Sequence, residues 1–298
     1  MNSFESQTDS FKNYVQNERR LSVHTLTSYA TDLAQFQEFL AQTFRLINFT
    51  EATHNEIRMW VVQLKENGIS SRSINRKIST LKSFYKYLLI RNEVETNPML
   101  KIISPKQSKK LPVYFEQKKL TDLFQLDVFT DDFQGLRDIL ILELLYGTGI
   151  RLSELINIKE SDIHGNEIKV LGKGNKERLV PITSRIEQLI PIYKAKRKEM
   201  FPSGKESLLL LTNKGDKLYE KLVYRTVNHY LGLVTNEKKR SPHTMRHSFA
   251  TNMLNNGAQL HTIKEILGHA NLAATQIYTH NSIERLKDAY KKFHPKEN

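Results

Sequence analysis

A proline- and lysine-rich stretch divides this sequence into two parts of different character. Residues 92–112 contain Pro98, Pro105 and Pro112. Proline has no amide hydrogen and a fixed φ, so prolines at this spacing prevent one helix from crossing the stretch. A chain of 298 residues, 39% of them hydrophobic, is long enough for two cores. We predict a domain at 1–91, a second at 113–298, and between them a basic linker at 92–112 that carries Lys101, Lys106, Lys109 and Lys110.

The first part has the periodicity of amphipathic helices. Apolar residues recur at three- and four-residue steps within 23–44, 52–68 and 70–92. In the third segment the apolar face consists of Ile74, Ile78, Leu81, Tyr85 and Leu88. The basic residues lie mostly off that face: Arg72, Arg76, Lys82 and Lys86. Such a row can follow a phosphate backbone, or it can be a solvated surface, and the pattern alone leaves both open.

The second part mixes helix and strand. The segment 135–149 is predicted to be a helix that ends at Gly147 and Gly149, and helices resume at about residue 219. Between them, Ile168 and Val170 alternate before the turn "GKGNK", which indicates a β-hairpin with Lys173 near its tip. The predicted fold class is therefore mostly α, with a small β-sheet or hairpin in the C-terminal domain.

Charge and composition limit the functions this chain can have. The formal net charge is +13 and the sequence pI about 9.6, which favours a polyanionic partner, either nucleic acid or an anionic membrane surface. With no cysteine, disulfides, thiolate catalysis and iron–sulfur clusters are excluded. We find no apolar leader near the N-terminus and no apolar run of the ~18 residues that a membrane span needs. A cytoplasmic protein is expected.

Four short stretches carry residues suited to anion binding or proton transfer. They are "TGIRLSEL" with Arg151, "LGKGNKERL" with Lys173, "SPHTMRHSF" with His243, Arg246 and His247, and "LGHANLAATQIYTH" with His269 and Tyr278. Taken singly, each residue could equally be a surface or packing side chain. Histidines four apart also suggest a metal pair, but Arg246 between them would place a permanent cation beside a dication. An anion site is therefore favoured over a metal site.

Together and in this order, these stretches resemble one family closely: the tyrosine site-specific recombinases, or phage integrase family. The resemblance runs through nearly the whole chain, since "LSVHTLTSYATDLAQFQEFL" and "SINRKISTLKSFYKYL" resemble the family's helical core-binding, SAM-like domain. The ending "ERLKDAYKKFHPKEN" resembles the Xer branch, which resolves chromosome dimers. The resemblance implies two domains that form a C-shaped clamp around a DNA duplex, with a C-terminal helix that is exchanged between protomers.

The resemblance also implies a mechanism that uses neither metal nor ATP nor another cofactor. Tyr278 would attack a DNA phosphodiester to form a 3′-phosphotyrosyl link, while Arg151 and Arg246 bind the phosphate. Lys173 would protonate the leaving 5′-oxygen, His243 would assist proton transfer from the tyrosine, and His269 would donate to a phosphate oxygen. Behind these groups, Glu154 would orient side chains and His247 would support packing. DNA contacts are expected from Arg72, Arg76, Lys82, Lys86, Lys109 and Lys110.

The implied partners are double-stranded DNA at a specific site and further protomers. Four subunits would assemble on two sites, with or without a second related recombinase and a DNA translocase as activator, in the cytoplasm at the nucleoid. Three other functions stay open. They are an integrase or transposase of a mobile element, a non-cleaving DNA-binding accessory protein, and a metal-dependent hydrolase that uses His243, His247 and His269.

Overall fold

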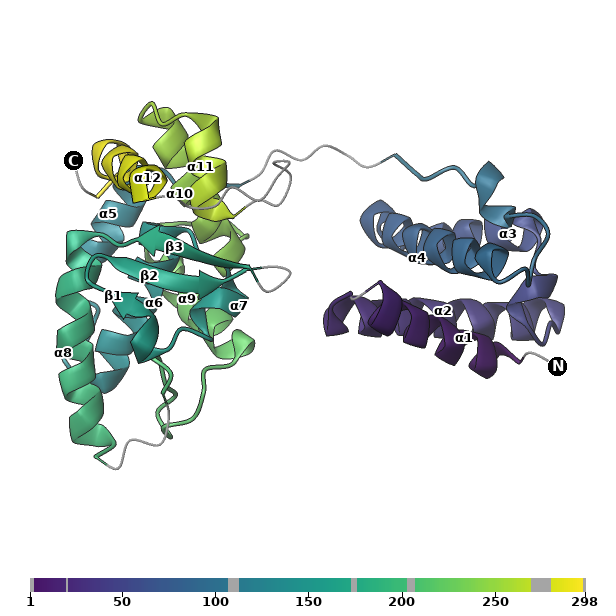
Figure 1. Ribbon diagram of the computed structural model, residues 1–298, viewed down its shortest axis with the longest axis horizontal. Coiled ribbons are helices and arrows are strands. Elements are labelled where there is room, and N and C mark those ends of the chain that lie inside the picture. The colour runs from purple at the N-terminus through teal and green to yellow at the C-terminus, as the bar shows by residue number, and fades with distance from the viewer. Residues whose placement is uncertain are drawn as a thin grey trace. The chain divides into compact units, whose positions relative to one another are not determined.

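The chain folds into two compact units, residues 1–110 and 111–298, each with a hydrophobic core of its own. The computed structural model (Figure 1) describes residues 3–19, 21–106, 113–172, 176–202, 207–268 and 280–296, without the side chains of His24 and of residues 280–286. Within these ranges most residues are helical and the strands form one small sheet, so the predicted fold class is confirmed.

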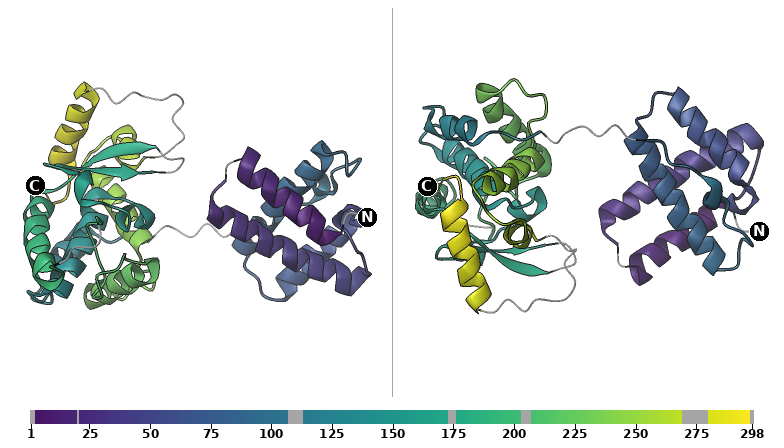
Figure 2. Two further views of the ribbon diagram at one scale, coloured as in Figure 1. Left: turned by 60° about the horizontal axis from the view of Figure 1, so that its bottom comes forward. Right: turned by 90° about the horizontal axis from the view of Figure 1, so that it is seen from above.

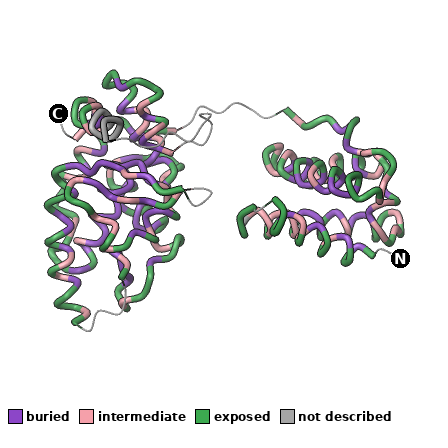
Figure 3. The backbone as a smooth tube through the Cα atoms, viewed as in Figure 1, coloured by how far each residue is buried: buried purple, intermediate pink, exposed green. Residues whose placement is uncertain are grey.

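Helices make up the first unit. Ser22, Thr53 and Ser70 each stand at the start of a long helix, and their side-chain oxygens accept a hydrogen bond from a backbone amide in its first turn. The elements are α1 (Phe4–Asn13), η1 (Tyr14–Glu18), α2 (Val23–Phe44), η2 (Phe49–Glu51), α3 (His54–Glu66), α4 (Ser71–Ile90) and η3 (Pro98–Lys101). Buried and exposed residues alternate along these helices at the period that the sequence shows (Figure 3).

The apolar face predicted for the third helical segment is the buried face of α4. Ile74, Ile78, Leu81, Tyr85 and Leu88 are all at most 1% exposed. Four basic residues of the same helix, Arg72, Arg76, Lys82 and Lys86, are exposed, whereas Lys77 is buried. The helix therefore presents an apolar side to the core and a basic side to solvent.

The compact first unit includes described residues of the stretch 92–112, which the sequence analysis predicted to be a linker. Met99 and Ile102 are 2% and 8% exposed in its core. The Asn75 amide donates a hydrogen bond of 3.0 Å to the Pro105 carbonyl. The prolines thus prevent a regular helix without detaching the chain, because the apolar residues between them are buried. Lys109 and Lys110 lie outside the described residues.

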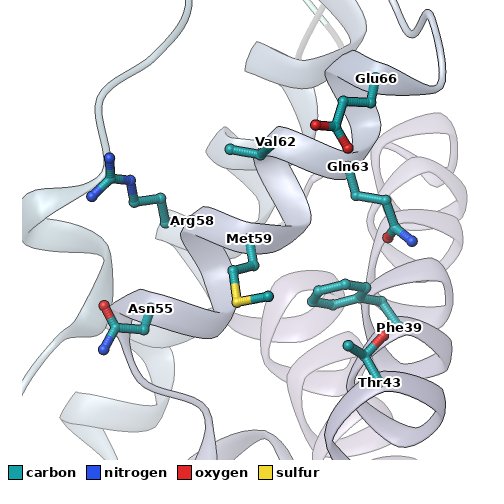
Figure 4. Close-up of a pocket in the computed structure, with 8 residues that line it drawn as sticks. All are labelled: Phe39, Thr43, Asn55, Arg58, Met59, Val62, Gln63 and Glu66. Carbon is teal, nitrogen blue, oxygen red and sulfur yellow. The ribbon is translucent and has the colours of Figure 1, made fainter.

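A groove of about 680 Å³ lies between α2 and α3 on the surface of the first unit. In Figure 4 the Met59 side chain points toward Phe39, with Arg58 and Glu66 at separate ends of the groove. Its walls are formed by Phe39, Thr43, Asn55, Arg58, Met59, Val62, Gln63 and Glu66. None of these residues is on α4, so the groove and the basic side of α4 are separate surfaces.

The second unit contains a small antiparallel sheet of order β1–β2–β3, with Val170 opposite Arg178 and Ile168 opposite Val180. This confirms the predicted hairpin and adds a short first strand. The elements are α5 (Gln117–Gln125), α6 (Phe133–Thr148), α7 (Leu152–Leu155), η4 (Glu160–Asp162), β1 (Ile163–His164), β2 (Glu167–Leu171), β3 (Glu177–Pro181), α8 (Ser184–Met200), α9 (Glu220–Val234), α10 (Pro242–Asn255), α11 (Leu260–Leu267) and α12 (His280–Phe293).

Helix α6 forms the centre of this unit. Nearly every residue from Phe133 to Thr148 is buried, and the helix packs against α8, α9 and α10. A helix that is buried on nearly all sides must be enclosed by other elements. The enclosing helices therefore fix the C-terminal end of α6. Arg151, the first predicted catalytic arginine, follows this end by a few residues.

The C-terminal segment packs on its own unit. Helix α12 contacts β3 and crosses the direction of the strand (Figure 2), and the Lys287 ammonium lies 3.0 Å from a Glu167 carboxylate oxygen. The buried Tyr290 hydroxyl donates to the Gly147 carbonyl, and Lys296 pairs with the fully buried Glu143. Residues 287–296 are thus anchored in cis here, and the exchange of this helix between protomers stays a prediction.

Candidate active site

A tight turn after α6 positions Arg151. Gly149 has φ +62°, a conformation that favours glycine. A Cβ at this position would lie 2.4 Å from Phe249 Cδ1 and 2.9 Å from Leu267 Cδ2. The glycine therefore allows α6, α10 and α11 to meet closely and lets the chain turn into α7 directly behind Arg151.

Glu154 fixes both the backbone and the side chain of Arg151. The Arg151 amide donates to Glu154 Oε2 at 2.7 Å, and Arg151 Nη1 donates to Oε1 at 2.8 Å. The Arg151 side chain stays 34% exposed while that of Glu154 is 2% exposed. This geometry fits the orienting role that the family resemblance implies for Glu154.

Another arginine, Arg178, which the sequence analysis did not select, also donates hydrogen bonds to the Glu154 carboxylate. Arg178 on β3 is 6% exposed and donates from Nη1 to Glu154 Oε1 at 2.8 Å and from Nη2 to Oε2 at 2.9 Å. Burial alone would raise the pKa of Glu154, but the hydrogen bonds and charge of Arg178, together with the bonds from Arg151, lower this pKa to about 2. Glu154 is therefore an anion throughout the neutral range.

Glu154→Gln is expected to destabilise the second unit in a pH-dependent way. The pKa of Glu154 is about 2 in the folded protein, against an ordinary value of 4.5 for this group. The carboxylate thus contributes roughly 3 kcal/mol that is fully present above about pH 4.5 and is lost as the pH falls toward 2. Urea denaturation should show a deficit of this order in the variant at pH 7 and a deficit of less than half that size near pH 3.

The exposed Glu177→Gln is the matched control, because Glu177 faces solvent on the same hairpin and pairs only with the half-exposed Lys169 among the described residues. This variant should change stability by less than about 1 kcal/mol. Equal deficits for the two variants, or a Glu154→Gln deficit that does not depend on pH, would contradict the role of the buried carboxylate.

Helix α10 presents the residues of the "HTMRH" motif. Ser241 accepts a hydrogen bond from the Thr244 amide and Pro242 occupies the first turn. His243 is exposed, His247 is half-buried and Arg246 is 7% exposed. The helix therefore begins at the motif and directs Arg246 inward.

Arg246 is anchored to backbone carbonyls. Its Nη1 donates to the Gly149 carbonyl and its Nη2 donates to the Leu267 carbonyl at 2.7 Å. Burial, followed by the positive charge of Arg151, lowers the pKa of Arg246 to about 9. A bound anion would relieve this penalty, because Glu154, the one carboxylate that pairs with these arginines among the described residues, is already shared between Arg151 and Arg178. The site has an excess of positive charge at its centre.

His247 fits the predicted packing role. Burial, and then the nearby His243, lowers the pKa of the His247 imidazole, which keeps this side chain neutral at pH 7. Among the described residues, no group of three or more histidine, aspartate or glutamate side chains is placed to hold a metal ion. Nor do these residues form a helix long and apolar enough to cross a membrane.

Lys173, His269 and Tyr278 lie outside the described residues, but described neighbours flank two of them. Gly172 precedes Lys173, and a Cβ built on it would lie 3.4 Å from Arg178 Nη1 and 3.7 Å from Glu154 Oε1. Gly268 precedes His269, and its carbonyl accepts a hydrogen bond from Arg151 Nη2 at 3.2 Å. The chain therefore enters both segments at the site that holds Arg151 and Arg246.

Two surfaces outside this centre carry several basic side chains each. On α4, Arg76 Nη1 lies 2.5 Å from an oxygen of the buried Asp32, which ties this arginine to the fold while it stays half-exposed. The second surface was not selected from the sequence. It is a groove of about 610 Å³ on α9 and the segment before α10, lined by Glu220, Lys221, Tyr224, Arg225, Asn228, Lys238 and Arg240. The four-residue step from Lys221 to Arg225 is the signal that could have indicated it.

Comparison with known protein families agrees with this geometry. Residues 114–285 match the model described as the phage integrase family, and residues 8–92 match the phage integrase N-terminal SAM-like domain. The two matches cover the second and first units respectively.

Known relatives match over almost the full length. A tyrosine recombinase XerC of Listeria innocua is 39% identical over 290 residues, with 96% of each chain covered. A tyrosine recombinase XerC of Staphylococcus aureus is 40% identical over 290 residues, covering 97% of this chain and 96% of its own. Among solved structures, the XerH site-specific recombinase in a post-cleavage complex with a palindromic difH substrate has a TM-score of 0.71 at 23% identity, covering 95% of this chain and 84% of its own.

The chain therefore belongs to the phage integrase family. It is a tyrosine recombinase of the Xer type, a site-specific enzyme that cleaves and rejoins DNA strands. The family and the enzyme class predicted from the sequence are thus confirmed.

Proposed function

We propose that Tyr278 is the nucleophile of this recombinase and that Arg151 and Arg246 bind the phosphate it attacks. The observation that carries the proposal is the charge at the site. Two arginines are held there by Glu154 and by backbone carbonyls, and burial beside Arg151 lowers the pKa of Arg246. A phosphodiester would supply the missing negative charge, and its transition state would supply more.

In the proposed reaction, the Tyr278 phenolic oxygen attacks the phosphorus and the bond to the 5′-oxygen breaks. His243 assists removal of the phenol proton, Lys173 protonates the departing 5′-oxygen, and His269 donates a hydrogen bond to a non-bridging oxygen. The 5′-hydroxyl of the partner strand then attacks the 3′-phosphotyrosyl link and releases the tyrosine. One phosphodiester bond is exchanged for another, so no external energy source is required.

Biologically, we propose resolution of chromosome dimers at cell division, by a protein in the cytoplasm at the nucleoid. The support is the family of the chain and the XerC relatives. Double-stranded DNA is the proposed partner, and a solved structure of similar fold contains DNA. The tetramer on two sites, the second related recombinase, the translocase activator and the clamp of the two units around the duplex remain predictions, as do the domain bounds.

A nicked suicide substrate tests the cleavage reaction. Wild-type protein should accumulate a covalent complex that survives denaturation in SDS, because loss of the nicked fragment prevents religation, and EDTA should leave the yield unchanged. A DNA-binding accessory protein would shift the DNA in a native gel without forming this complex. A metal-dependent hydrolase would release cut DNA and lose its activity in EDTA.

Chromatin precipitation separates chromosome resolution from mobile-element integration. One bound site near the replication terminus is the expected result. Binding at several scattered element ends would instead identify an integrase or a transposase.

Arg72→Ala on α4 is expected to weaken DNA binding and to reduce the dependence of affinity on salt. Each phosphate contact releases about one counterion, so the slope of log K against log salt should fall by roughly one. Arg72 serves better than Arg76 for this test, because loss of Arg76 would also remove an ion partner of the buried Asp32. Filter binding between about 50 and 200 mM salt measures the slope.

Arg58→Ala is the control for this measurement. Arg58 is also exposed, but it lies on α3 in the groove of Figure 4. Its removal should leave the slope as in the wild type. An unchanged slope in Arg72→Ala would make the basic side of α4 a solvated surface instead.

A further inference from the structure

Three arginines bind three consecutive carbonyls at the end of α11. Arg178 Nε donates to the Ile266 carbonyl at 3.0 Å, Arg246 Nη2 to the Leu267 carbonyl at 2.7 Å, and Arg151 Nη2 to the Gly268 carbonyl at 3.2 Å. The last carbonyls of a helix have no intrahelical partner and carry partial negative charge, so cations satisfy them well. Arg151 and Arg246 belong to the proposed phosphate site, whereas the function of Arg178 is unassigned.

Arg178 is the most extensively bound of the three. Its guanidinium uses Nη1 and Nη2 on the two oxygens of Glu154 and Nε on the Ile266 carbonyl, and its side chain is 5% exposed. With its hydrogen bonds directed at protein groups and so little of it exposed, this side chain is poorly placed to contact a bound DNA strand. Any effect of Arg178 on the reaction must therefore pass through its neighbours.

The charges around Arg178 show that its largest effect is on Glu154 and, through Glu154, on Arg151. Without Arg178, Glu154 would be a buried carboxylate paired with Arg151 alone, and it would neutralise the arginine that binds the phosphate. With Arg178 present, one positive charge offsets Glu154, and Arg151 and Arg246 together retain two positive charges for the ligand. Arg178 thus keeps Glu154 available as an orienting group while the charge of Arg151 is preserved.

The position of Arg178 also links three segments of the site. It lies on β3, at the base of the hairpin whose turn contains Lys173, and opposite Val170 in the sheet. Gly268 has φ +63°, and a Cβ built on it would lie 3.0 Å from both Cδ and Nε of Arg178. The hairpin, the residues around Arg151 and the start of the segment with His269 are thus all in contact with one side chain.

We propose that Arg178 is a positioning residue for DNA strand cleavage, which holds Glu154 and the end of α11 so that Arg151 is presented to the scissile phosphate. The proposal rests on the proposed function of Arg151 and extends it to a side chain that does not touch the substrate.

The test measures the rate of covalent complex formation on the nicked substrate for Arg178→Lys and Arg178→Met. A lysine keeps the charge but cannot reach two carboxylate oxygens and a carbonyl at once. We expect the rate to fall roughly 10-fold in Arg178→Lys and 100-fold in Arg178→Met, as for small displacements of a catalytic group, with DNA affinity unchanged.

A pH profile distinguishes positioning from a general loss of stability. In Arg178→Met, burial of Glu154 is no longer offset by Arg178, so the pKa of this carboxyl rises and its protonated form stops accepting both bonds from Arg151. The rate should therefore fall more steeply below roughly pH 6 in this variant than in wild type. Among the described residues, the other charged side chains that face Glu154 or line the groove beside it are Arg151, Arg246, Lys159, Asp162, Lys169, Glu177 and Lys217. Because these side chains are the same in both proteins, the difference between the two pH profiles reports on Arg178. Adding Glu154→Gln to Arg178→Met should abolish this additional loss of rate in acid.

Arg197→Met is the matched structural control. Arg197 is equally buried at 7%, donates to the Leu208 and Leu209 carbonyls at 2.7 and 3.0 Å, and pairs with Glu160. It should lower the melting temperature as Arg178→Met does while the cleavage rate stays as in wild type. Wild-type rates in both Arg178 variants, or an equal loss of rate in Arg197→Met, would overturn the proposal. Absence of the complex in wild type itself would instead refute the proposed function.

Discussion

Tyr278→Phe is expected to bind its DNA site with wild-type affinity and to form no covalent complex. The substitution removes one oxygen atom, which is the proposed nucleophile, and leaves the aromatic ring in place. No other group in the proposed reaction can replace it, since Lys173, His243 and His269 act on protons and on phosphate oxygens. The measurement pairs a native gel, for binding, with a denaturing gel of the same samples, for the complex.

Tyr193→Phe is the control, because the chain has 12 tyrosines and the assay must distinguish among them. Tyr193 is fully buried on α8 and its hydroxyl accepts a hydrogen bond from the Leu211 amide at 3.2 Å. This variant should lose some stability and keep complex formation. A complex formed by Tyr278→Phe would show that another tyrosine is the nucleophile.

Arg151→Ala and Arg246→Ala should each slow complex formation by roughly 10²–10³-fold, the effect of removing one preorganised donor from a transition state. The two variants should differ in stability. Arg246 is 7% exposed and satisfies the carbonyls of Gly149 and Leu267, so its truncation leaves buried acceptors unpaired at about 1–3 kcal/mol each. Arg151 is 34% exposed and its loss should cost less.

Single-turnover rates at saturating DNA separate this chemistry from binding. Arg246→Lys retains a positive charge without the two-carbonyl anchor and should be slow but better folded than Arg246→Ala. If both alanine variants cleave at close to the wild-type rate, the two arginines do not bind the scissile phosphate.

The helices and the hairpin could be predicted because each has a simple hydrophobic period. The predicted face of α4 is the buried one, and the alternation of Ile168 and Val170 places both in the core. The residue at which the first unit ends was harder to predict from the sequence. Met99 and Ile102 are apolar residues between prolines with no period, so the sequence gives no sign that they pack on preceding helices.

The site was predictable as far as its motifs extend. Arg151 and Arg246 were selected from local sequence, and the structure brings them to the same helix end. Arg178 was not selected, because a basic residue beside a lysine-rich turn resembles ordinary surface charge. Yet Arg178 shares its side of β3 with the buried Val180. A charged residue in phase with the apolar side of a strand indicates a buried partner, here Glu154, 24 residues earlier.

The acceptors that hold the arginines are mostly main-chain oxygens, and this affects how such a site can change over evolutionary time. Every amino acid supplies a carbonyl, so Ile266 and Leu267 can be exchanged for other apolar residues without removing an acceptor. Among the four residues that supply these carbonyls, only Gly149 and Gly268 are constrained, by their positive φ and close neighbours. Divergent descendants of this chain can therefore accept many substitutions around the phosphate site and still inherit the same orientation of its cations.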